Sequence, residues 1–193
     1  RRLSSAASDV YKRQITPMLL RELGATTINI NCNPDGFNIN ENSAVLNQNL
    51  FAEYAKNYKF DYCVAVDGDG DRIVLSDDKG TIFSGDDILY TLASRNKITG
   101  KNQSDTVVGT IMSNEGVVEA LSMLGIRFLR ADVGDKFISR ELVKNDLNLG
   151  AEPSGHIIQR EFSESGDANI ALIQTLSALQ ELDTTISLSL IHI

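Results

Sequence analysis

Residues 61–75 read DYCVAVDGDGDRIVL, an apolar run interrupted by three carboxylates at alternate positions. Residues 63–66 are short, apolar and rich in β-branched side chains, which favours a buried strand. Gly68 and Gly70 permit backbone angles that other residues resist, so the acids lie in a loop at the end of this strand. The stretch therefore predicts a strand, an acidic loop and a second strand.

The acidic loop carries Asp67, Asp69 and Asp71, which repel one another at this spacing. A hard divalent cation with oxygen ligands is the simplest way to remove that repulsion, and we expect Mg²⁺ with these three ligands. Arg72 follows directly and is a candidate catalytic residue. Its guanidinium can donate two hydrogen bonds to a metal-bound phosphate, although it can also pair with the neighbouring acids.

Two other readings of the loop compete with a magnesium site. A calcium loop of the EF-hand type needs Gly at the position of Arg72 and usually Glu at the position of Asp78, so the spacing excludes it. A plain hairpin turn stays possible because Gly and Asp both favour turns. A turn needs only one or two such residues, and five in alternation followed by Arg favour the metal site.

The loop DGDGDR at residues 67–72 resembles the metal-binding loop of the α-D-phosphohexomutases. Further stretches are similar to that family in the same order: NPDGFNIN at 33–40, GTIMSN at 109–114, VGDK at 133–136 and GAEPSGH at 150–156. Several motifs in order are more specific than one, because single short motifs match by chance. The resemblance covers residues 15 to 182. It implies two consecutive α/β domains of the phosphohexomutase type, each a mixed sheet flanked by helices.

The resemblance also implies an activity. Members of the family isomerise hexose phosphates through a phosphoserine enzyme and a bisphosphorylated intermediate. Residues 33–40 are the reason to expect glucosamine 6-phosphate and glucosamine 1-phosphate, for amino-sugar and cell-wall precursor synthesis, rather than mannose or glucose phosphates. Because phosphoryl transfer requires mainly positioning and charge neutralisation, a cation held by three Asp has an evident role in it.

Glu152, Ser154 and His156 are the expected substrate-binding residues. They alternate, so in an extended segment their side chains would project the same way, toward one ligand. Carboxylate and hydroxyl groups can bind sugar hydroxyls, and a histidine can donate a proton near neutral pH. The family resemblance assigns this loop to sugar recognition. Lys136 is a weaker catalytic candidate, for proton transfer or phosphate binding, because a single lysine in a turn is more often solvated.

Two family motifs are not found in the sequence: a phosphoserine loop of the Thr-Ala-Ser-His-Asn type and a phosphate clamp of the Arg-x-Ser-Gly-Thr type. The chain therefore resembles the two middle domains of a four-domain enzyme, with the N- and C-terminal domains of that enzyme as its partners. Alone, it is predicted to have no turnover and to bind metal weakly. A non-catalytic module that binds sugar phosphate or metal stays an alternative. A phosphatase with Asp67 as nucleophile fits less well, because Gly70-Asp71-Arg72 does not suit it.

Charge and cysteine content limit the partners and the compartment. Eighteen Lys and Arg against 26 Asp and Glu give a net charge of −8, which argues against nucleic acid and anionic membranes. Cys32 and Cys63 lie in strand-like contexts and are expected to be buried thiols in a reducing compartment, the cytoplasm. Neither a membrane span nor a signal-peptide core is expected from the apolar pattern.

The chain is expected to divide at its polar stretch 95–105, giving a metal-loop domain at 15–94 and a sugar-loop domain at 106–183. Residues 1–14 and 184–193 have no counterpart in the family and stay unassigned tails. We expect these tails to be remnants of cloning or sequencing; resequencing the source DNA and finding both ends continuous with the gene would contradict this. Helices are expected at 15–23, 43–57, 86–93, 113–124, 137–144 and 168–182. Strands are expected at 26–31, 63–66, 73–76, 81–83, 106–111, 126–131, 149–151 and 157–159.

Overall fold

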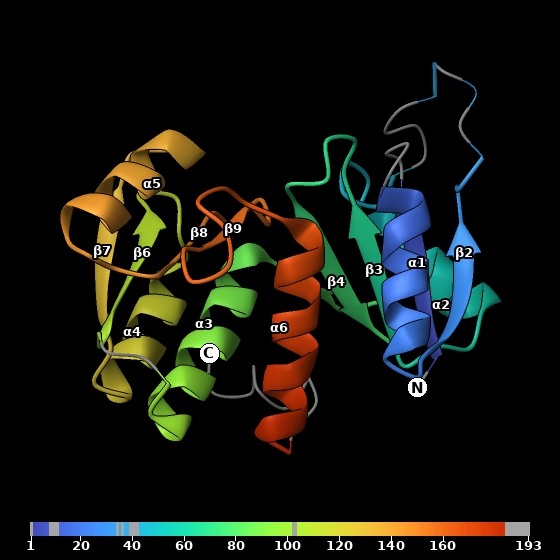
Figure 1. Ribbon diagram of the computed structural model, residues 1–193. Helices are drawn as coiled ribbons and strands as arrows, with labels where there is room; N and C mark the ends of the chain where they lie inside the picture. Colours follow the sequence, from blue (N-terminus) through green and yellow to red (C-terminus); the bar gives the residue numbers. More distant parts are fainter. Residues whose placement is uncertain are drawn as a thin grey trace. The chain divides into compact units, whose positions relative to one another are not determined.

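The structure of the protein is a computed structural model, which describes residues 2–7, 12–33, 35, 37–38, 43–101 and 104–183. The chain divides into two compact units, Arg1–Phe83 and Ser84–Ile193. Each unit has a mixed β-sheet flanked by helices, so the expected α/β class is confirmed (Figure 1). Among the described residues, no helix is both long enough and apolar enough to cross a membrane.

The first unit is built on a five-stranded sheet. Its strands are β1 (Arg2–Ala7), β2 (Thr26–Ile30), β3 (Tyr62–Val66), β4 (Ile73–Asp77) and β5 (Ile82–Phe83). They lie in the order β2-β1-β3-β4-β5. The pairs β1–β2 and β1–β3 are parallel, whereas β3–β4 and β4–β5 are antiparallel. The acidic loop therefore joins two neighbouring antiparallel strands, as the sequence predicts.

Burial explains why β3 and β4 form a rigid support for this loop. Every residue of both strands is buried, and Val66 pairs with Ile73 where the loop leaves the sheet. Helix α2 (Asn49–Asn57) covers part of the sheet and places Phe51 and Tyr54 in a core with residues of β3 and β4. Helix α1 (Lys12–Glu22) packs against β1 and β2.

The N-terminal region differs from the sequence-based expectation. Residues 2–7 are not an unassigned tail but the strand β1, paired with β2 on one side and β3 on the other. Backbone hydrogen bonds to two neighbours place this strand, and the hydrophobic pattern gives no sign of it. Helix α1 begins at Lys12, so Pro17 lies inside the helix and not in its first turn. Helix α2 begins at Asn49 and not at residue 43.

Two segments for which the sequence analysis made predictions lie wholly or partly outside the described residues. The family-like stretch 33–40 includes residues 34, 36, 39 and 40, which the structure does not describe. The C-terminal tail 184–193 also lies outside them. Cys32 and Cys63 do not form a disulfide, as expected. Cys63 is buried, but Cys32 is only partly buried.

The second unit is built on a four-stranded sheet of order β7-β6-β8-β9. The strands are β6 (Thr106–Thr110), β7 (Arg127–Ala131), β8 (Leu149–Ala151) and β9 (Ile157–Gln159), and only β9 runs antiparallel to its neighbour. The helices are α3 (Gly85–Thr99), α4 (Glu115–Met123), α5 (Asp135–Lys144) and α6 (Ala168–Glu181). Helix α3 lies between α4 and α6, and α5 covers the other face of the sheet (Figure 1).

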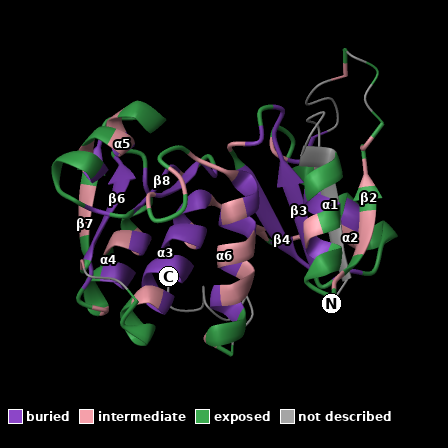
Figure 2. Cartoon of the chain, in the orientation of Figure 1, coloured by how far each residue is buried: buried purple, intermediate pink, exposed green. Residues whose placement is uncertain are grey.

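The boundary between the units lies before α3, and the expected boundary at 95–105 is wrong. Helix α3 continues to Thr99, and most of its residues are buried, in contact with α4, α6 and β8 (Figure 2). The polar composition of residues 95–105 favours a linker. The side chain of Arg95, the first residue of this stretch, is nevertheless only 6% exposed. Its Nη2 donates to Gln174 Oε1 at 3.0 Å. A charged residue with a partner on α6 thus belongs to a helix interface.

Side-chain caps are present at the starts of α4 and α6. Asn114 Oδ1 accepts a hydrogen bond from the backbone N–H of Gly116, and Asp167 Oδ1 accepts from the N–H groups of Asn169 and Ile170. These contacts satisfy donors that the first helical turn leaves without a partner.

Replacing Asp167 by Ala is expected to lower the free energy of unfolding by about 1 kcal/mol, because two N–H groups of α6 lose their acceptor. Urea unfolding of the two proteins measures the difference. Asp167→Asn keeps a capping oxygen and serves as the matched control. Equal stability of the Ala variant and the parent would contradict the role of this cap.

Candidate functional site

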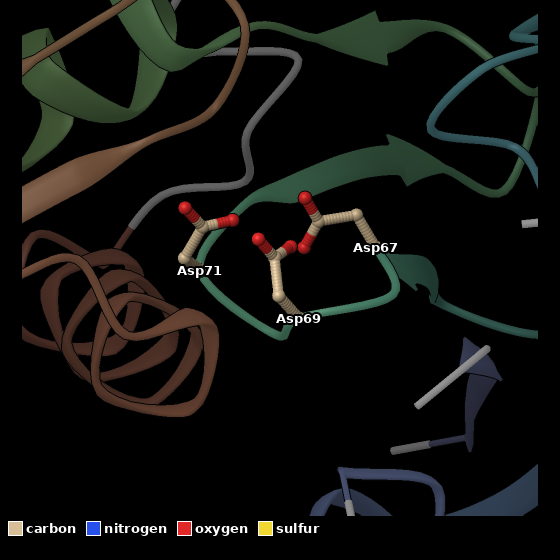
Figure 3. A group of neighbouring side chains, drawn as sticks. All are labelled: Asp67, Asp69 and Asp71. Atoms are coloured by element: carbon tan, nitrogen blue, oxygen red, sulfur yellow. The ribbon is translucent and has the colours of Figure 1, made fainter. Parts of the chain in front are cut away.

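The acidic loop brings the three predicted carboxylates together. One ligand oxygen each from Asp67, Asp69 and Asp71 can be chosen so that all lie within 4.8 Å of one another. Figure 3 shows the three carboxylates gathered at the loop between β3 and β4. The loop closes because Gly70 adopts φ +73° and donates its N–H to Asp67 O at 3.3 Å. The predicted juxtaposition is thus present in the fold.

Asp67 is the buried member of this cluster, with an exposed fraction of 5%. Its Oδ1 accepts a hydrogen bond from the backbone N–H of Arg72 at 3.0 Å. Burial, then a hydrogen bond and charge repulsion from Asp71, raises the pKa of Asp67 to about 7. Burial also acts to raise the pKa of Asp69, but hydrogen bonds with Asp67 and with the backbone hold it below its usual value. Burial therefore opposes ionisation of Asp67 in the metal-free chain.

The raised pKa of Asp67 predicts how the metal-free chain responds to pH. Between the ordinary carboxyl value of 3.8 and about 7, the folded state keeps a proton that the unfolded state has lost. The free energy of unfolding should therefore fall as pH rises through this window, by on the order of 2 kcal/mol, and level off above it.

Urea unfolding from about pH 5 to about pH 8 in the presence of a chelator measures this change. Asp67→Asn carries no titrating group at this position and should lack this part of the pH dependence. Identical pH profiles for the two proteins would contradict the raised pKa of Asp67.

Arg72 lies beside the cluster without a close ion pair to it. Its Nε is 3.9 Å from Asp67 Oδ2 and 4.0 Å from Asp71 Oδ1, and 46% of its side chain is exposed. Such contacts at an exposed side chain contribute little to stability. The guanidinium can therefore leave the acids and meet an incoming anion.

The residues form a set of ligands that suits a hard cation. All three side chains offer carboxylate oxygens, which are the ligands that hard divalent cations prefer. Asp67, Asp69 and Asp71 would hold the ion, with Arg72 beside them. The cluster could therefore hold a metal ion.

The second predicted site lies in the other unit, in the turn between β8 and β9. Residues 152–156 form a tight turn and not an extended segment, with hydrogen bonds from Glu152 N–H to His156 O at 2.9 Å and from Gly155 N–H to Glu152 O at 3.0 Å. The expected common direction of the three side chains, derived from an extended strand, is therefore not supported. Glu152 and His156 are buried, whereas Ser154 is exposed.

The structure brings this turn into contact with the stretch 133–136. The two segments lie apart in the sequence, so the sequence alone does not predict this contact. Gly134 donates its N–H to Glu152 Oε1 at 2.9 Å, immediately before α5 begins. A carboxylate at the start of a helix is favoured by the partial positive charge there. Lys136 does not lie in a connecting loop but is the second residue of helix α5. Its side chain is exposed, and its Nζ lies 4.8 Å from the centre of the Phe137 ring.

The ring of His156 lies close against Gly166, which the sequence analysis did not assign to the site. A Cβ on Gly166 would lie 2.5 Å from His156 Nε2, so only glycine allows this close approach. Gly134, with φ +125°, is the second residue missed. In the sequence, the only indication of Gly134 and Gly166 as site residues is that each is a glycine next to a motif. Sequence alone does not distinguish such a glycine from one in an ordinary turn.

Asp86 and Asp87 both lie in the first turn of α3 but bind different partners. Asp87 forms a capping box with Ser84, its Oδ2 accepting from the backbone N–H and the hydroxyl of Ser84 at 2.7 Å each. Asp86 instead accepts from the N–H of Asn114 at 2.8 Å, and burial raises its pKa. Asp86 thereby joins the starts of α3 and α4.

Comparison with protein families gives matches to both units. A model described as phosphoglucomutase/phosphomannomutase, α/β/α domain II, matches residues 9–80, and the corresponding domain III model matches residues 84–192. Phosphoglucosamine mutase from Psychrobacter cryohalolentis is 45% identical over 166 residues, which cover 86% of this chain and 36% of that protein. The chain thus spans little more than a third of the length of that curated relative.

Solved structures show the same fold at lower identity. A phosphoglucomutase/phosphomannomutase family protein from Burkholderia thailandensis superposes with a TM-score of 0.77 at 18% identity, covering 92% of this chain and 40% of that one. N-acetylphosphoglucosamine mutase from Aspergillus fumigatus, in complex with GlcNAc-6P and magnesium, has a TM-score of 0.57 at 18% identity, covering 99% and 42%.

Proposed function

The chain belongs to the phosphoglucomutase/phosphomannomutase family of α-D-phosphohexomutases, and on this premise we propose that it is part of a phosphoglucosamine mutase. The proposed reaction interconverts glucosamine 6-phosphate and glucosamine 1-phosphate through a phosphoserine enzyme and a bisphosphate intermediate. The observation that carries the proposal is the gathering of three carboxylates at the end of a buried strand, beside an available arginine. The proposed setting is cytoplasmic amino-sugar synthesis.

The proposed metal is Mg²⁺, held by Asp67, Asp69 and Asp71. When bound, the ion would neutralise negative charge on a phosphoryl group. Asp67 supplies a buried oxygen that the backbone N–H of Arg72 orients. Arg72 would donate hydrogen bonds to the phosphate oxygens, since its side chain is 46% exposed and its contacts with the acids are long.

Glu152, Ser154 and His156 are the proposed substrate-binding residues of the second unit. Ser154 is the exposed member at the tip of the turn, so its hydroxyl can reach a sugar directly. The carboxylate of Glu152 is oriented by the Gly134 N–H and could accept from sugar hydroxyls with its remaining oxygen. Lys136 is exposed in the first turn of α5 and is the proposed phosphate-binding or proton-transfer lysine.

The substrate within the family is tested with a panel of glucosamine, glucose and mannose phosphates on the full-length enzyme. We expect the highest kcat/KM for glucosamine 6-phosphate, because the curated relatives at 45% identity are phosphoglucosamine mutases. A clear preference for mannose or glucose phosphate would contradict this choice and leave the family assignment intact.

The chain alone is expected to show no mutase turnover and only weak metal binding. Its sequence has no recognised serine loop to carry the transferred phosphoryl group, and a phosphoserine would add charge and a ligand to the metal. Incubating the purified chain with glucosamine 6-phosphate and Mg²⁺ tests this, with phosphorus NMR to detect glucosamine 1-phosphate. Measurable conversion would contradict the need for further domains.

A further inference from the structure

The second unit contains a polar cleft next to strands β8 and β9. The cleft lies at the ends of these strands that are farther from the Glu152–His156 turn. The cleft measures about 260 Å³, and six of its lining residues are Arg95, Asn96, Lys101, Asn148, Gln159 and Phe162. They come from the end of α3 and the residues after it, from the residue before β8, and from the end of β9 and the segment that follows it. Because β8 is three residues long, the cleft and the turn lie roughly 10 Å apart along the strand.

Gln159 is the residue that points to a ligand. It is the last residue of β9, it is only 7% exposed, and it lines the cleft. Within the described part of the chain, its Nε2 is buried without a hydrogen-bond partner. A buried amide with no partner costs on the order of 1–3 kcal/mol, so such a group usually bonds ordered water or a bound molecule when no protein group is in reach.

The charges around the cleft nearly balance. Arg95 and Lys101 both form ion pairs with Glu181, with nitrogen to oxygen distances of 3.8 and 3.0 Å, and Glu161 adds a second acid to the lining. An anion would have to compete with Glu181 for both cations. A cation would meet the buried guanidinium of Arg95. The balance therefore favours a neutral ligand.

The chemistry of the lining suits hydroxyl groups. Asn96, Asn148 and Gln159 carry carboxamides, in which a donor and an acceptor lie side by side. Asn96 Oδ1 already accepts a hydrogen bond from Arg95 Nε at 2.9 Å, which leaves its NH₂ group for a ligand. A hydroxyl group also donates and accepts, so neighbouring hydroxyls complement such groups. Phe162 is 49% exposed at the cleft and offers an apolar face to the C–H side of a ring.

We propose that this cleft, here called the amide cleft, binds a small neutral polyhydroxylated molecule, either a monosaccharide or a linear polyol. The volume lies just below the roughly 300 Å³ at which pockets for larger ligands begin, so a single ring or a short polyol suits it. The site is separate from the proposed substrate loop and does not depend on the proposed reaction.

The test titrates the ¹⁵N-labelled chain with glucose, glycerol and inorganic phosphate and follows the side-chain amide signal of Gln159. Gln159→Leu identifies the signal by its absence, and Gln48→Leu, at an exposed position in the first unit, is the matched control. We expect a saturable shift with glucose or glycerol; glucose as the stronger ligand indicates a ring, and equal binding indicates a polyol. Affinity, followed on backbone amides of the cleft, should fall about tenfold in Gln159→Leu and stay unchanged in Gln48→Leu.

Ser154→Ala separates this site from the proposed substrate loop, and the shift of the Gln159 amide should persist in that variant. Phe162→Ala removes an exposed side chain, so it should weaken glucose binding without disturbing the fold. The proposal is overturned if neither glucose nor glycerol gives a saturable shift, if only phosphate does, or if the Gln159→Leu chain binds glucose as tightly as the parent.

Discussion

Replacing Asp69 by Asn is expected to lower the affinity of the chain for Mg²⁺ or Mn²⁺ by at least about 100-fold. The loop offers three carboxylate oxygens within 4.8 Å of one another, and the change removes one full charge and one anionic ligand. Loss of groups that only support a metal ligand already costs about 10- to 100-fold, so loss of a ligand should cost more. Isothermal titration calorimetry with Mn²⁺ measures the change.

Asp78→Asn is the matched control for this experiment. Asp78 is exposed in the turn between β4 and β5, so its replacement removes the same charge from the same unit without touching the cluster. We expect its effect on affinity to be small, because only long-range attraction is lost. If Asp69→Asn and Asp78→Asn weaken metal binding equally, the loop is not the metal site and the acids act only through net charge.

Replacing Gly85 by Ala is expected to destabilise the second unit by about 3 kcal/mol or more. A Cβ on Gly85 would lie 1.8 Å from the carbonyl oxygen of Glu152 and 2.9 Å from Gly155 N. Both are backbone atoms of the turn, so neither can move like a flexible side chain. The turn or the start of α3 must shift, and the hydrogen bond from Gly85 N–H to Pro153 O at 3.1 Å would be lost.

Gly100→Ala distinguishes this close approach from backbone strain. Gly100 ends α3 at φ +67° with no atom within 4 Å of an added Cβ, so its replacement costs only about 1 kcal/mol. Urea unfolding followed by amide signals of the second unit measures both variants separately from the first unit. Equal destabilisation by the two substitutions would contradict the tight packing of α3 against the turn.

The sequence predicts the parts of the fold whose side-chain pattern and local structure agree. The run 63–66 is apolar and β-branched and forms a buried strand, and the helices expected at 113–124 and 168–182 begin within two residues of those positions. The acidic loop is predictable for the same reason, because its three ligands lie within five residues and one turn brings them together. Local spacing is sufficient for these features.

Features that depend on distant partners are not predictable from local pattern. Strand β1 has no amphipathic period, and its place between β2 and β3 follows from backbone pairing. Arg95 looks like part of a linker until Gln174, 79 residues later, supplies its acceptor. The contact of Glu152 with Gly134 and the ring of His156 against Gly166 likewise join segments that the sequence lists separately.

The most direct test of the metal site is to locate the ion on the ¹⁵N-labelled chain. Traces of Mn²⁺ broaden the signals of nearby amides, and excess Mg²⁺ should reverse the effect by competition. We expect the broadening to centre on residues 67–72, where three carboxylates meet, and to disappear there in Asp69→Asn. Broadening that centres elsewhere, or that Asp69→Asn leaves unchanged, would contradict a metal site in the acidic loop and with it the proposed basis of phosphoryl transfer.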